Sequence, residues 1–234
     1  MADPHIAVRF DRDFNSLASR MMALGGLVEA QTRQAVQALL AGDADGALTV
    51  VENEAQVDRL ELEIDRDLCS AFSRRQPKAS ELRLLTAMVR TTATLERVGD
   101  EAERIARGVQ SLLQHADTQL GPAELRPAAD LASAQLRRAL DAFARLDTAG
   151  AIEVLRDDQA VDEEFDRFVA SVSACMASQP RCVATGVDLV LVAKAIERIG
   201  HRARDIAEAI IYIVQGADVR HGDRASWAGI GRSR

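Results

Sequence analysis

Aromatic residues, prolines and cysteines are all scarce in this sequence, and each scarcity narrows the possible structures. Of the 234 residues only 3% are aromatic, and there are five prolines and 14 glycines. Ala, Leu, Arg and Glu dominate instead, a composition that favours helix nearly throughout. The three cysteines are odd in number and lack metal-site spacing, so we expect isolated thiols in a reducing compartment. They are Cys69, Cys175 and Cys182.

The sequence also lacks an excess of positive charge and a long apolar run. Its formal net charge is -7, whereas a specific nucleic-acid-binding domain usually carries a basic face, so no nucleic-acid partner is expected. No segment approaches the roughly 18 apolar residues that a membrane span requires. Residues 1–10 are polar and lack the apolar region of a signal peptide, which predicts a cytoplasmic protein.

A twelve-residue segment occurs twice, about a hundred residues apart. Residues 95–106 read LERVGDEAERIA, and residues 196–207 read IERIGHRARDIA. Glu, Arg, Gly, Ala, Ile and Ala recur in register, and apolar residues match at two further positions. Such a match indicates a duplicated structural unit.

Apolar residues recur every three or four positions along six segments, which is the spacing of amphipathic helices. We therefore predict an all-α fold of two tandem repeated three-helix bundles, residues 1–118 and 119–216, followed by a mobile tail at 217–234. Short turns at 76–80 and 178–180 make the last two helices of each repeat an antiparallel hairpin. The predicted helices span residues 12–40, 44–74, 81–114, 122–146, 149–176 and 182–214.

Glycines and aspartates mark the helix ends. Gly42 is expected to end the first helix and Asp43 to cap the second, and Asp147 repeats the capping role in the second repeat. Gly25 and Gly26 interrupt the first helix and indicate a bend or a tight helix crossing.

Pairs of acidic residues four positions apart lie on the two hairpin helices of the first repeat. Glu54 and Asp58 share one helix face, and Glu96 and Asp100 share another. The midpoint of each pair lies 21 residues from the turn near Pro77. In an antiparallel hairpin both pairs are therefore level, about 30 Å from the turn.

The second repeat has the same arrangement, with a histidine in place of one of the four acids. Asp158 and Asp162 lie as far before the turn at 179–180 as Glu197 and His201 lie after it. A histidine adds a nitrogen ligand, which favours Fe, Mn or Zn over Mg or Ca.

Acidic groups gathered at one level repel one another. The apolar stripe that we assign to helix 44–74, from Leu48 through Leu62 to Phe72, also contains Asp58 and Asp65, and acidic residues are rarely buried without a partner. Bound cations remove this conflict, because hard and borderline cations prefer carboxylate oxygens. We therefore predict binding of divalent or trivalent metal ions (Fe, Mn, Zn or Mg). The predicted ligands are Glu54, Asp58, Glu96, Asp100, Asp158, Asp162, Glu197 and His201, with Gly99 and Gly200 leaving space beside them.

Two other interpretations compete with this one. With 36 acidic residues in 234, chance alone gives roughly five acidic pairs at i,i+4, so the protein could be a helical scaffold whose acidic faces are solvated. Arg97 or Arg198 would then neutralise some of the charge. A ferritin-like dimetal enzyme would instead require Glu-x-x-His motifs on two helices, and no Glu precedes a His by three residues here.

The paired motifs resemble those of the PhoU family of phosphate-uptake regulators. The resemblance is carried by Glu-Arg-Val-Gly-Asp at 96–100 and Glu-Arg-Ile-Gly-His at 197–201, each paired with an upstream Glu/Asp-x-x-x-Asp. Residues 10–11 and 21–25 are similar too, and the resemblance extends to about Gly216. The family usually has Asp at the position of His201. It commonly has Asn at the positions of Arg104 and Asp205.

The resemblance implies a repeated three-helix fold without catalytic activity and with metal clusters on the acidic faces. It implies a cytoplasmic homodimer that reaches the membrane only through two partners, the ATPase of the phosphate ABC transporter and a sensor histidine kinase. When phosphate is plentiful, such a protein restrains phosphate uptake and keeps the phosphate-starvation genes off. We accordingly expect a non-enzymatic adaptor in phosphate homeostasis.

Overall fold

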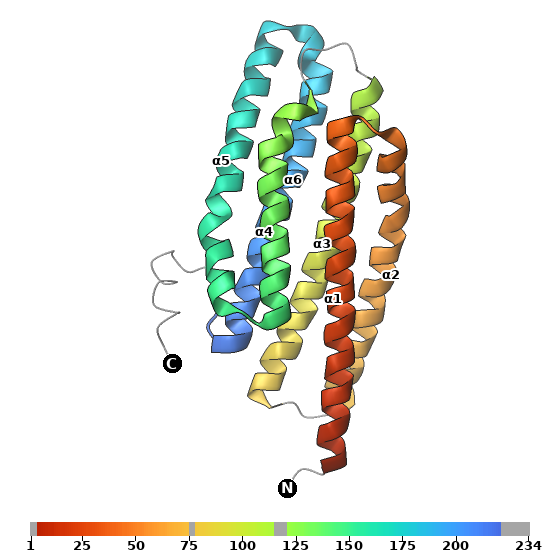
Figure 1. The fold of residues 1–234 in the computed structure, drawn as a ribbon, viewed down its shortest axis with the longest axis vertical. Helices are drawn as coiled ribbons and strands as arrows, with labels where there is room; N and C mark the ends of the chain where they lie inside the picture. Colours follow the sequence, from red (N-terminus) through yellow and green to blue (C-terminus); the bar gives the residue numbers. More distant parts are fainter. Residues whose placement is uncertain (1–3, 75–77, 115–120, 221–234) are drawn as a thin grey trace.

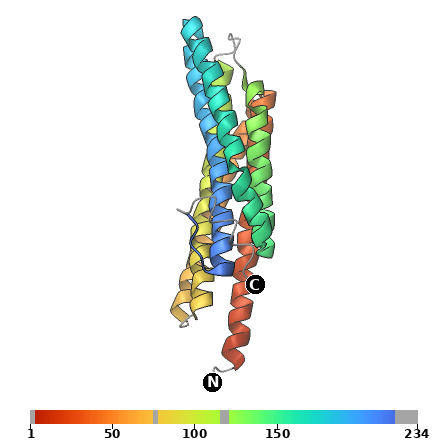
Figure 2. The ribbon, with the colours of Figure 1, turned by 90° about the vertical axis from the view of Figure 1, so that its left-hand side faces the viewer.

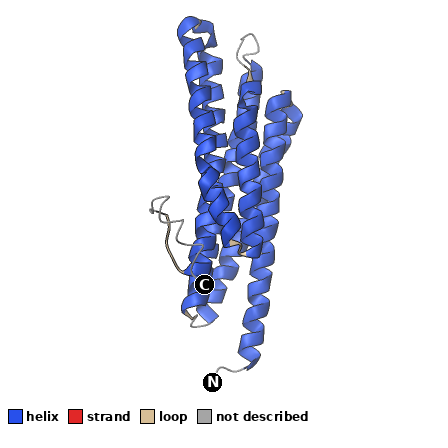
Figure 3. Cartoon of the chain, turned by 60° about the vertical axis from the view of Figure 1, so that its left-hand side comes forward, coloured by secondary structure: helices blue, strands red, loops and turns tan. Residues whose placement is uncertain are grey.

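The computed structural model describes residues 4–74, 78–114 and 121–220, and these ranges contain helices and turns but no strand (Figure 3). The all-α prediction is therefore confirmed. Two short 3-10 helices, Pro122–Leu125 and Pro180–Cys182, precede the fourth and sixth α-helices. The α-helices are α1 (Pro4–Ala41), α2 (Ala44–Arg74), α3 (Ala79–Gln114), α4 (Arg126–Arg145), α5 (Thr148–Ser178) and α6 (Val183–Gln215).

The six helices form two three-helix units that lie side by side in an elongated molecule (Figures 1 and 2). Helices α1, α2 and α3 pack on one another, and so do α4, α5 and α6. Helices α3 and α6 form the most extensive contact between the units, and α1 also touches α4. None of the described helices combines the length and apolar character needed to cross a bilayer.

Helices α3 and α6 run antiparallel through the centre of the molecule. Near one end, the Ser111 hydroxyl donates to Asp188 Oδ2 at 2.6 Å. Further along, Arg198 Nη1 lies 3.5 Å from Glu101 Oε1. Residues near 100 on α3 and near 199 on α6 are therefore level, so the acidic segments of the two repeats lie at one height.

The predicted helix ends lie within two residues of the observed ends, except at the starts of the first and fourth helices. The first helix begins at Pro4, eight residues before the predicted start at residue 12. Helix α1 passes Gly25 and Gly26 without a break, and the tight-crossing alternative is confirmed: a Cβ at Gly25 would lie 2.9 Å from Leu140 Cδ2 of α4. The fourth helix begins at Arg126 rather than at residue 122. Pro127 lacks the N–H that would continue an α-helical ladder back to Ala123, so residues 122–125 form a 3-10 turn.

The predicted capping aspartates act as expected. Asp43 Oδ1 accepts from Gly46 N–H at 3.0 Å after Gly42 has left the helix with a φ of 64°. Asp147 Oδ1 accepts from Ala149 and Gly150 N–H at 3.0 and 3.2 Å. The duplicated unit thus includes the same helix start.

The predicted apolar stripe of α2 is wrong. Leu62 on that stripe is 52% exposed and Asp58 is exposed, whereas the neighbouring stripe faces the core. Both stripes have helical spacing, but the predicted one would bury Asp58 and Asp65 and the observed one buries a single acid, Glu54. The buried positions are Ala47, Val50, Glu54, Val57, Ile64 and Leu68.

Helical spacing also predicts that Val187, Val190, Leu191, Ala195 and Ile199 form the inner face of helix 182–214, and this prediction is partly wrong. Val190, Ala195 and Ile199 lie at or near the core, but Val187 and Leu191 are exposed, Leu191 by 64%. Most of the predicted tail, residues 221–234, lies outside the described residues. The first part, Ala217–Arg220, turns back after Gly216, with Val219 buried.

Candidate metal centres

Glu54 on α2 is a buried carboxylate with no compensating partner. It is 8% exposed, and neither of its oxygens accepts a hydrogen bond from any described residue. A Cβ at Gly99 would lie 2.7 Å from Glu54 Oε1 and 3.1 Å from Oε2. The carboxylate therefore lies directly against the α3 backbone, and the glycine of the repeated motif makes this approach sterically possible.

The surrounding acids add to the cost of ionising Glu54. Burial, and then the charges of Asp58, Asp100, Glu103 and Glu96, raises the pKa of Glu54 from 4.5 to about 7. The four predicted ligands of the first repeat therefore share one electrostatic environment. A bound cation would reverse this shift, because an adjacent positive charge favours the ionised form.

Two further acids belong to this environment. Burial, then Asp65, Asp58 and Asp100, raises the pKa of Glu61. Glu103 is among the groups that raise the pKa of Glu54, after burial, Asp58 and Asp100. The sequence analysis missed both, although Glu61 follows Glu54, and Glu103 follows Glu96, by seven residues, which keeps each on the same helix face.

The pKa of Glu96 follows the same pattern. Burial raises it, followed by the charges of Asp100, Glu61 and Asp58, while Arg97 acts in the opposite direction. We call Glu54, Asp58, Glu61, Glu96, Asp100 and Glu103 the first acidic cluster.

Arginines lie at the edge of the first acidic cluster. Arg104 Nη1 is 2.6 Å from Glu101 Oε1, and its Nη2 is 3.7 Å from Asp100 Oδ2. Arg107 Nη2 is 2.7 Å from Glu103 Oε1. Arg104 thus pairs mainly with Glu101, and its weaker contact with Asp100 leaves the Glu54 carboxylate uncompensated.

In the second repeat, three predicted ligands converge. One ligand atom each from Asp162, Glu197 and His201 lies within 4.8 Å of the others, a spacing that suits one ion. His201 Nε2 is 2.9 Å from Asp162 Oδ1. Lys194 forms an ion pair with Glu197 Oε2. Among the described residues only this triad has that spacing, so the first cluster is the more open of the two.

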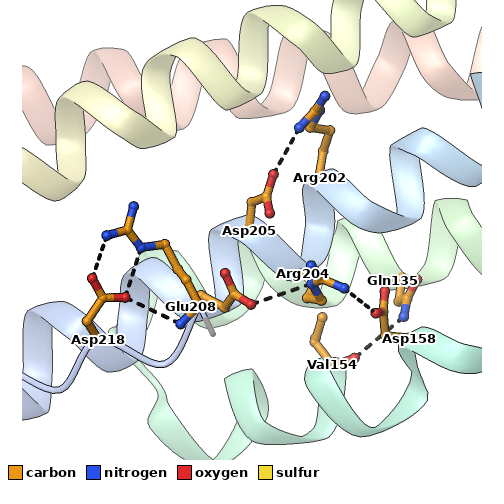
Figure 4. Close-up of polar contacts among 9 residues, drawn as sticks. Gln135, Val154, Asp158, Arg202, Arg204, Asp205, Glu208 and Asp218 are labelled. Carbon is orange, nitrogen blue, oxygen red and sulfur yellow. Dashed lines mark hydrogen bonds and ion pairs between the residues drawn. The ribbon is translucent and has the colours of Figure 1, made fainter. Parts of the chain in front are cut away.

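Asp158, the fourth predicted ligand of the second repeat, is instead engaged by an arginine (Figure 4). Arg204 Nη1 donates to Asp158 Oδ2 at 3.1 Å, and Arg204 Nε lies 3.5 Å from Glu208 Oε1. Asp158 is 7% exposed and Glu208 is 6% exposed. The arginine therefore lies between two buried acids, and Asp158 lies outside the triad.

Three of the six positions of the first acidic cluster carry a residue that is not acidic in the second repeat. Offsets of 104 residues for α2 and α5, and of 101 for α3 and α6, align the two hairpins. On this alignment Glu61 corresponds to Phe165, Asp100 to His201 and Glu103 to Arg204. Gly200, the equivalent of Gly99, lies against Gln135 and Val161 rather than against a carboxylate.

The two donor sets fit different cations. The first cluster offers only carboxylate oxygens, with both oxygens of buried Glu54 available, and oxygen ligands suit hard cations such as Mg²⁺ or Fe³⁺. The triad Asp162, Glu197 and His201 combines oxygen and nitrogen ligands, which suit Zn, Fe or Mn. The ferritin-like alternative required a four-helix bundle, whereas each site lies on one hairpin of a three-helix unit.

Comparison with known proteins gives a consistent result. The PhoU domain family matches residues 21–109 and again 125–210. A phosphate-specific transport system accessory protein PhoU homolog from Burkholderia sp is 42% identical over 224 residues, covering 94% of this chain and 95% of the relative. The Escherichia coli (strain K12) protein PhoU of the same system is 35% identical over 219 residues, covering 93% and 90%.

Two crystal structures have the same fold. PhoU from Pseudomonas aeruginosa superposes with a TM-score of 0.86 at 35% identity, covering 89% of this chain and 100% of that one. The phosphate transport system regulatory protein PhoU from Streptococcus pneumoniae gives 0.83 at 23% identity, covering 90% and 99%, which shows likeness of fold alone. Together with the doubled family match, these relatives show that the chain belongs to the PhoU family.

Proposed function

We propose that this protein regulates phosphate uptake and the response to phosphate starvation. The observation that carries the proposal is the family match over both repeats, together with relatives named as accessory proteins of phosphate-specific transport that are 35–42% identical over 93–94% of the chain. The proposed role is that of a non-enzymatic cytoplasmic adaptor, active as a homodimer. Its partners would be the ATPase of the phosphate ABC transporter and a membrane sensor histidine kinase.

We further propose that each hairpin binds metal ions. In the first repeat, Glu54, Asp58, Glu96 and Asp100 would hold the ion, with Glu61 and Glu103 beside them. In the second repeat, Asp162, Glu197 and His201 would hold it, and Asp158 would join only if it left Arg204. The support for this proposal is the uncompensated Glu54 carboxylate in one repeat and the convergent triad in the other.

The metal would act structurally. A cation supplies the positive charge that the first acidic cluster lacks, and this charge would hold α2 against α3 at the level of Gly99. Without it, the acids repel one another and Glu54 takes up a proton near pH 7. The metal content would thus set how tightly the arms of the hairpin associate, and a partner that contacts both arms would respond to it.

Deletion of the gene tests the regulatory role. In phosphate-rich medium we expect the deletion to derepress a phosphate-starvation reporter, and the wild-type gene to restore repression. Complementation with Asp58→Asn/Glu96→Gln is expected to restore repression only in part, with Arg66→Gln on the exposed surface of α2 as the matched control. Unchanged reporter output on deletion would contradict the regulator assignment.

A further inference from the structure

A cavity of about 400 Å³ lies between α3 and α6 near the end of α6. Gly216 has a φ of 72° and turns the chain so that Asp218 and Arg220 form part of the cavity wall. Its volume falls in the range of small-molecule sites, roughly 300–1,000 Å³. None of the predicted metal ligands lines the cavity.

Every carboxylate that lines this cavity already has an arginine partner. Asp205 Oδ2 accepts from Arg202 at 3.1 Å. Asp218 Oδ1 accepts from Arg220 Nε at 2.8 Å. Figure 4 shows the pair of Arg202 and Asp205, together with Glu208 and its partner Arg204, whose Nε is 3.5 Å from Glu208 Oε1. The acids of the cavity are therefore largely neutralised from within the chain.

Two guanidinium groups of the lining are left over. Arg90 and Arg97 both lie on α3, and neither comes within ion-pair distance of a carboxylate in the described parts of the chain. Each acts on acids only at longer range, Arg90 on Asp218 and Arg97 on Glu61 and Glu96. The Arg90 guanidinium carbon lies 5.6 Å from the centroid of the Tyr212 ring on α6. The cavity wall thus presents two guanidinium groups that no ion pair among the described residues holds, although the whole chain is acidic.

The pseudo-symmetry of the repeats explains why Arg97 has no ion-pair partner among the described residues. At the α3–α6 contact, Arg198 Nη1 lies 3.5 Å from buried Glu101. With the offset of 101 residues, Arg198 on α6 corresponds to Arg97 on α3, and Glu101 on α3 corresponds to Arg202 on α6. Two arginines cannot form the equivalent ion pair, and Arg202 pairs with Asp205 instead. The position that holds a carboxylate on one side of the molecule therefore lacks one on the other.

From this arrangement we infer that the cavity is a binding site for a small organic anion with at least two negative charges. Arg90 and Arg97 are seven residues apart on one helix face, a rise of about 10 Å, so they suit an elongated anion. Guanidinium groups bind phosphate and carboxylate oxygens in forked geometry. The Tyr212 ring and the walls at Ala87 and Ala209 would contact the organic part.

Tyr212 makes the inference directly testable. It is the only tyrosine in the sequence, so labelling with 3-fluorotyrosine gives one ¹⁹F resonance, located in this cavity. We would titrate the full-length protein with ADP, with citrate and with inorganic phosphate, each with and without a chelator. The ADP arm probes an organic diphosphate, the citrate arm an organic carboxylate, and the phosphate arm an anion too small to reach both arginines.

We expect ADP or citrate to shift the resonance with a Kd below about 1 mM, with or without chelator, and inorganic phosphate to bind more weakly. Arg90→Ala/Arg97→Ala should weaken that binding at least tenfold, while Arg66→Ala on α2 leaves it unchanged.

The inference fails if neither ADP nor citrate binds at about 5 mM, if inorganic phosphate binds as tightly as they do, or if the double variant binds like the wild type. Circular dichroism spectra of the variants check that the helices are intact. The gene-deletion reporter does not bear on this result, so either proposal can fail alone.

Discussion

The α2–α3 and α5–α6 hairpins share a backbone plan but neutralise their acidic groups differently. In the first, Glu54 is one of six clustered acids, and neither Glu54 oxygen has a partner in the described part of the chain. In the second, Arg204 occupies the position of Glu103 and binds both Asp158 and Glu208. The same place in the fold therefore carries an internal cation in the second repeat, whereas in the first repeat the buried carboxylate has none among the described residues.

This difference shows what duplication preserves. The hairpin, the motif glycine and the level of the acidic groups recur, because they follow from helix length and close packing. The charge at single positions changes freely, because a buried acid needs a positive partner but not a particular one. We therefore expect the two hairpins to respond differently to removal of one charged group and to a change of pH.

The largest expected effect concerns Arg204 and its equivalent. Arg204→Ala leaves Asp158 and Glu208 as unpaired buried acids, so we expect a loss of about 3 kcal/mol or more in the free energy of unfolding. Glu103→Ala at the equivalent position removes one of several repelling acids, and in metal-free protein it should change stability by less than about 1 kcal/mol. Urea denaturation in the presence of a chelator measures both. Equal losses would contradict the contrast between the repeats.

Next in size is the pH dependence of Glu54. Its pKa of about 7 in the folded protein is above the usual 4.5. Between these pH values the folded state binds more protons than the unfolded state, so the free energy of unfolding falls as pH rises from 4.5 to 7. Glu54→Gln should therefore stabilise metal-free protein by on the order of 2 kcal/mol at pH 8 and by almost nothing at pH 4.

The second repeat provides the control for this experiment. Asp158 is paired with Arg204, so Asp158→Asn should destabilise the protein at pH 8, the opposite sign. Unfolding free energies measured between pH 4 and pH 8 in the presence of a chelator give the pH dependence of stability for both variants. A Glu54→Gln variant that is less stable than the wild type at pH 8 would show that Glu54 has a favourable partner.

The smallest expected effect concerns the two motif glycines. A Cβ at Gly99 would displace the Glu54 carboxylate, whose oxygens lie 2.7 and 3.1 Å from it, whereas a Cβ at Gly200 meets Gln135 Oε1 at 3.1 Å. We expect Gly99→Ala to weaken metal binding at the first cluster about tenfold, and Gly200→Ala to leave binding at the triad nearly unchanged. Titration of each variant with Mn²⁺ compares them. Equal weakening at both sites would indicate that the glycines act through helix packing alone.

The fold was predictable from the sequence because its determinants are local. Helical spacing, the capping aspartates Asp43 and Asp147, and the duplicated motif fix the helices and their order. Equal distances from the turn predicted that Glu54 would meet the acids of α3, and Glu54 does lie against Gly99. These inferences need only helix geometry and chain connectivity.

What the sequence could not provide depends on rotation about the helix axes and on side-chain competition. Two adjacent stripes of α2 have helical spacing, and only packing against α1 and α3 decides that Glu54 rather than Asp58 is buried. The engagement of Asp158 by Arg204 depends on the exact facing of α5 and α6. Glu61 and Glu103 could have been found by extending each acidic pair by one further turn.

The most direct test is the metal content of paired variants. Purified protein would be stripped with chelator, reloaded with iron, manganese, zinc or magnesium, and analysed by mass spectrometry after desalting. We predict that Asp58→Asn/Glu96→Gln removes only the metal of the first repeat, that Asp162→Asn/His201→Gln removes only that of the second, and that the losses add when all four are combined. If the wild-type protein retains no metal, or if each double variant retains as much as the wild type, the hairpins do not bind cations and the account is contradicted.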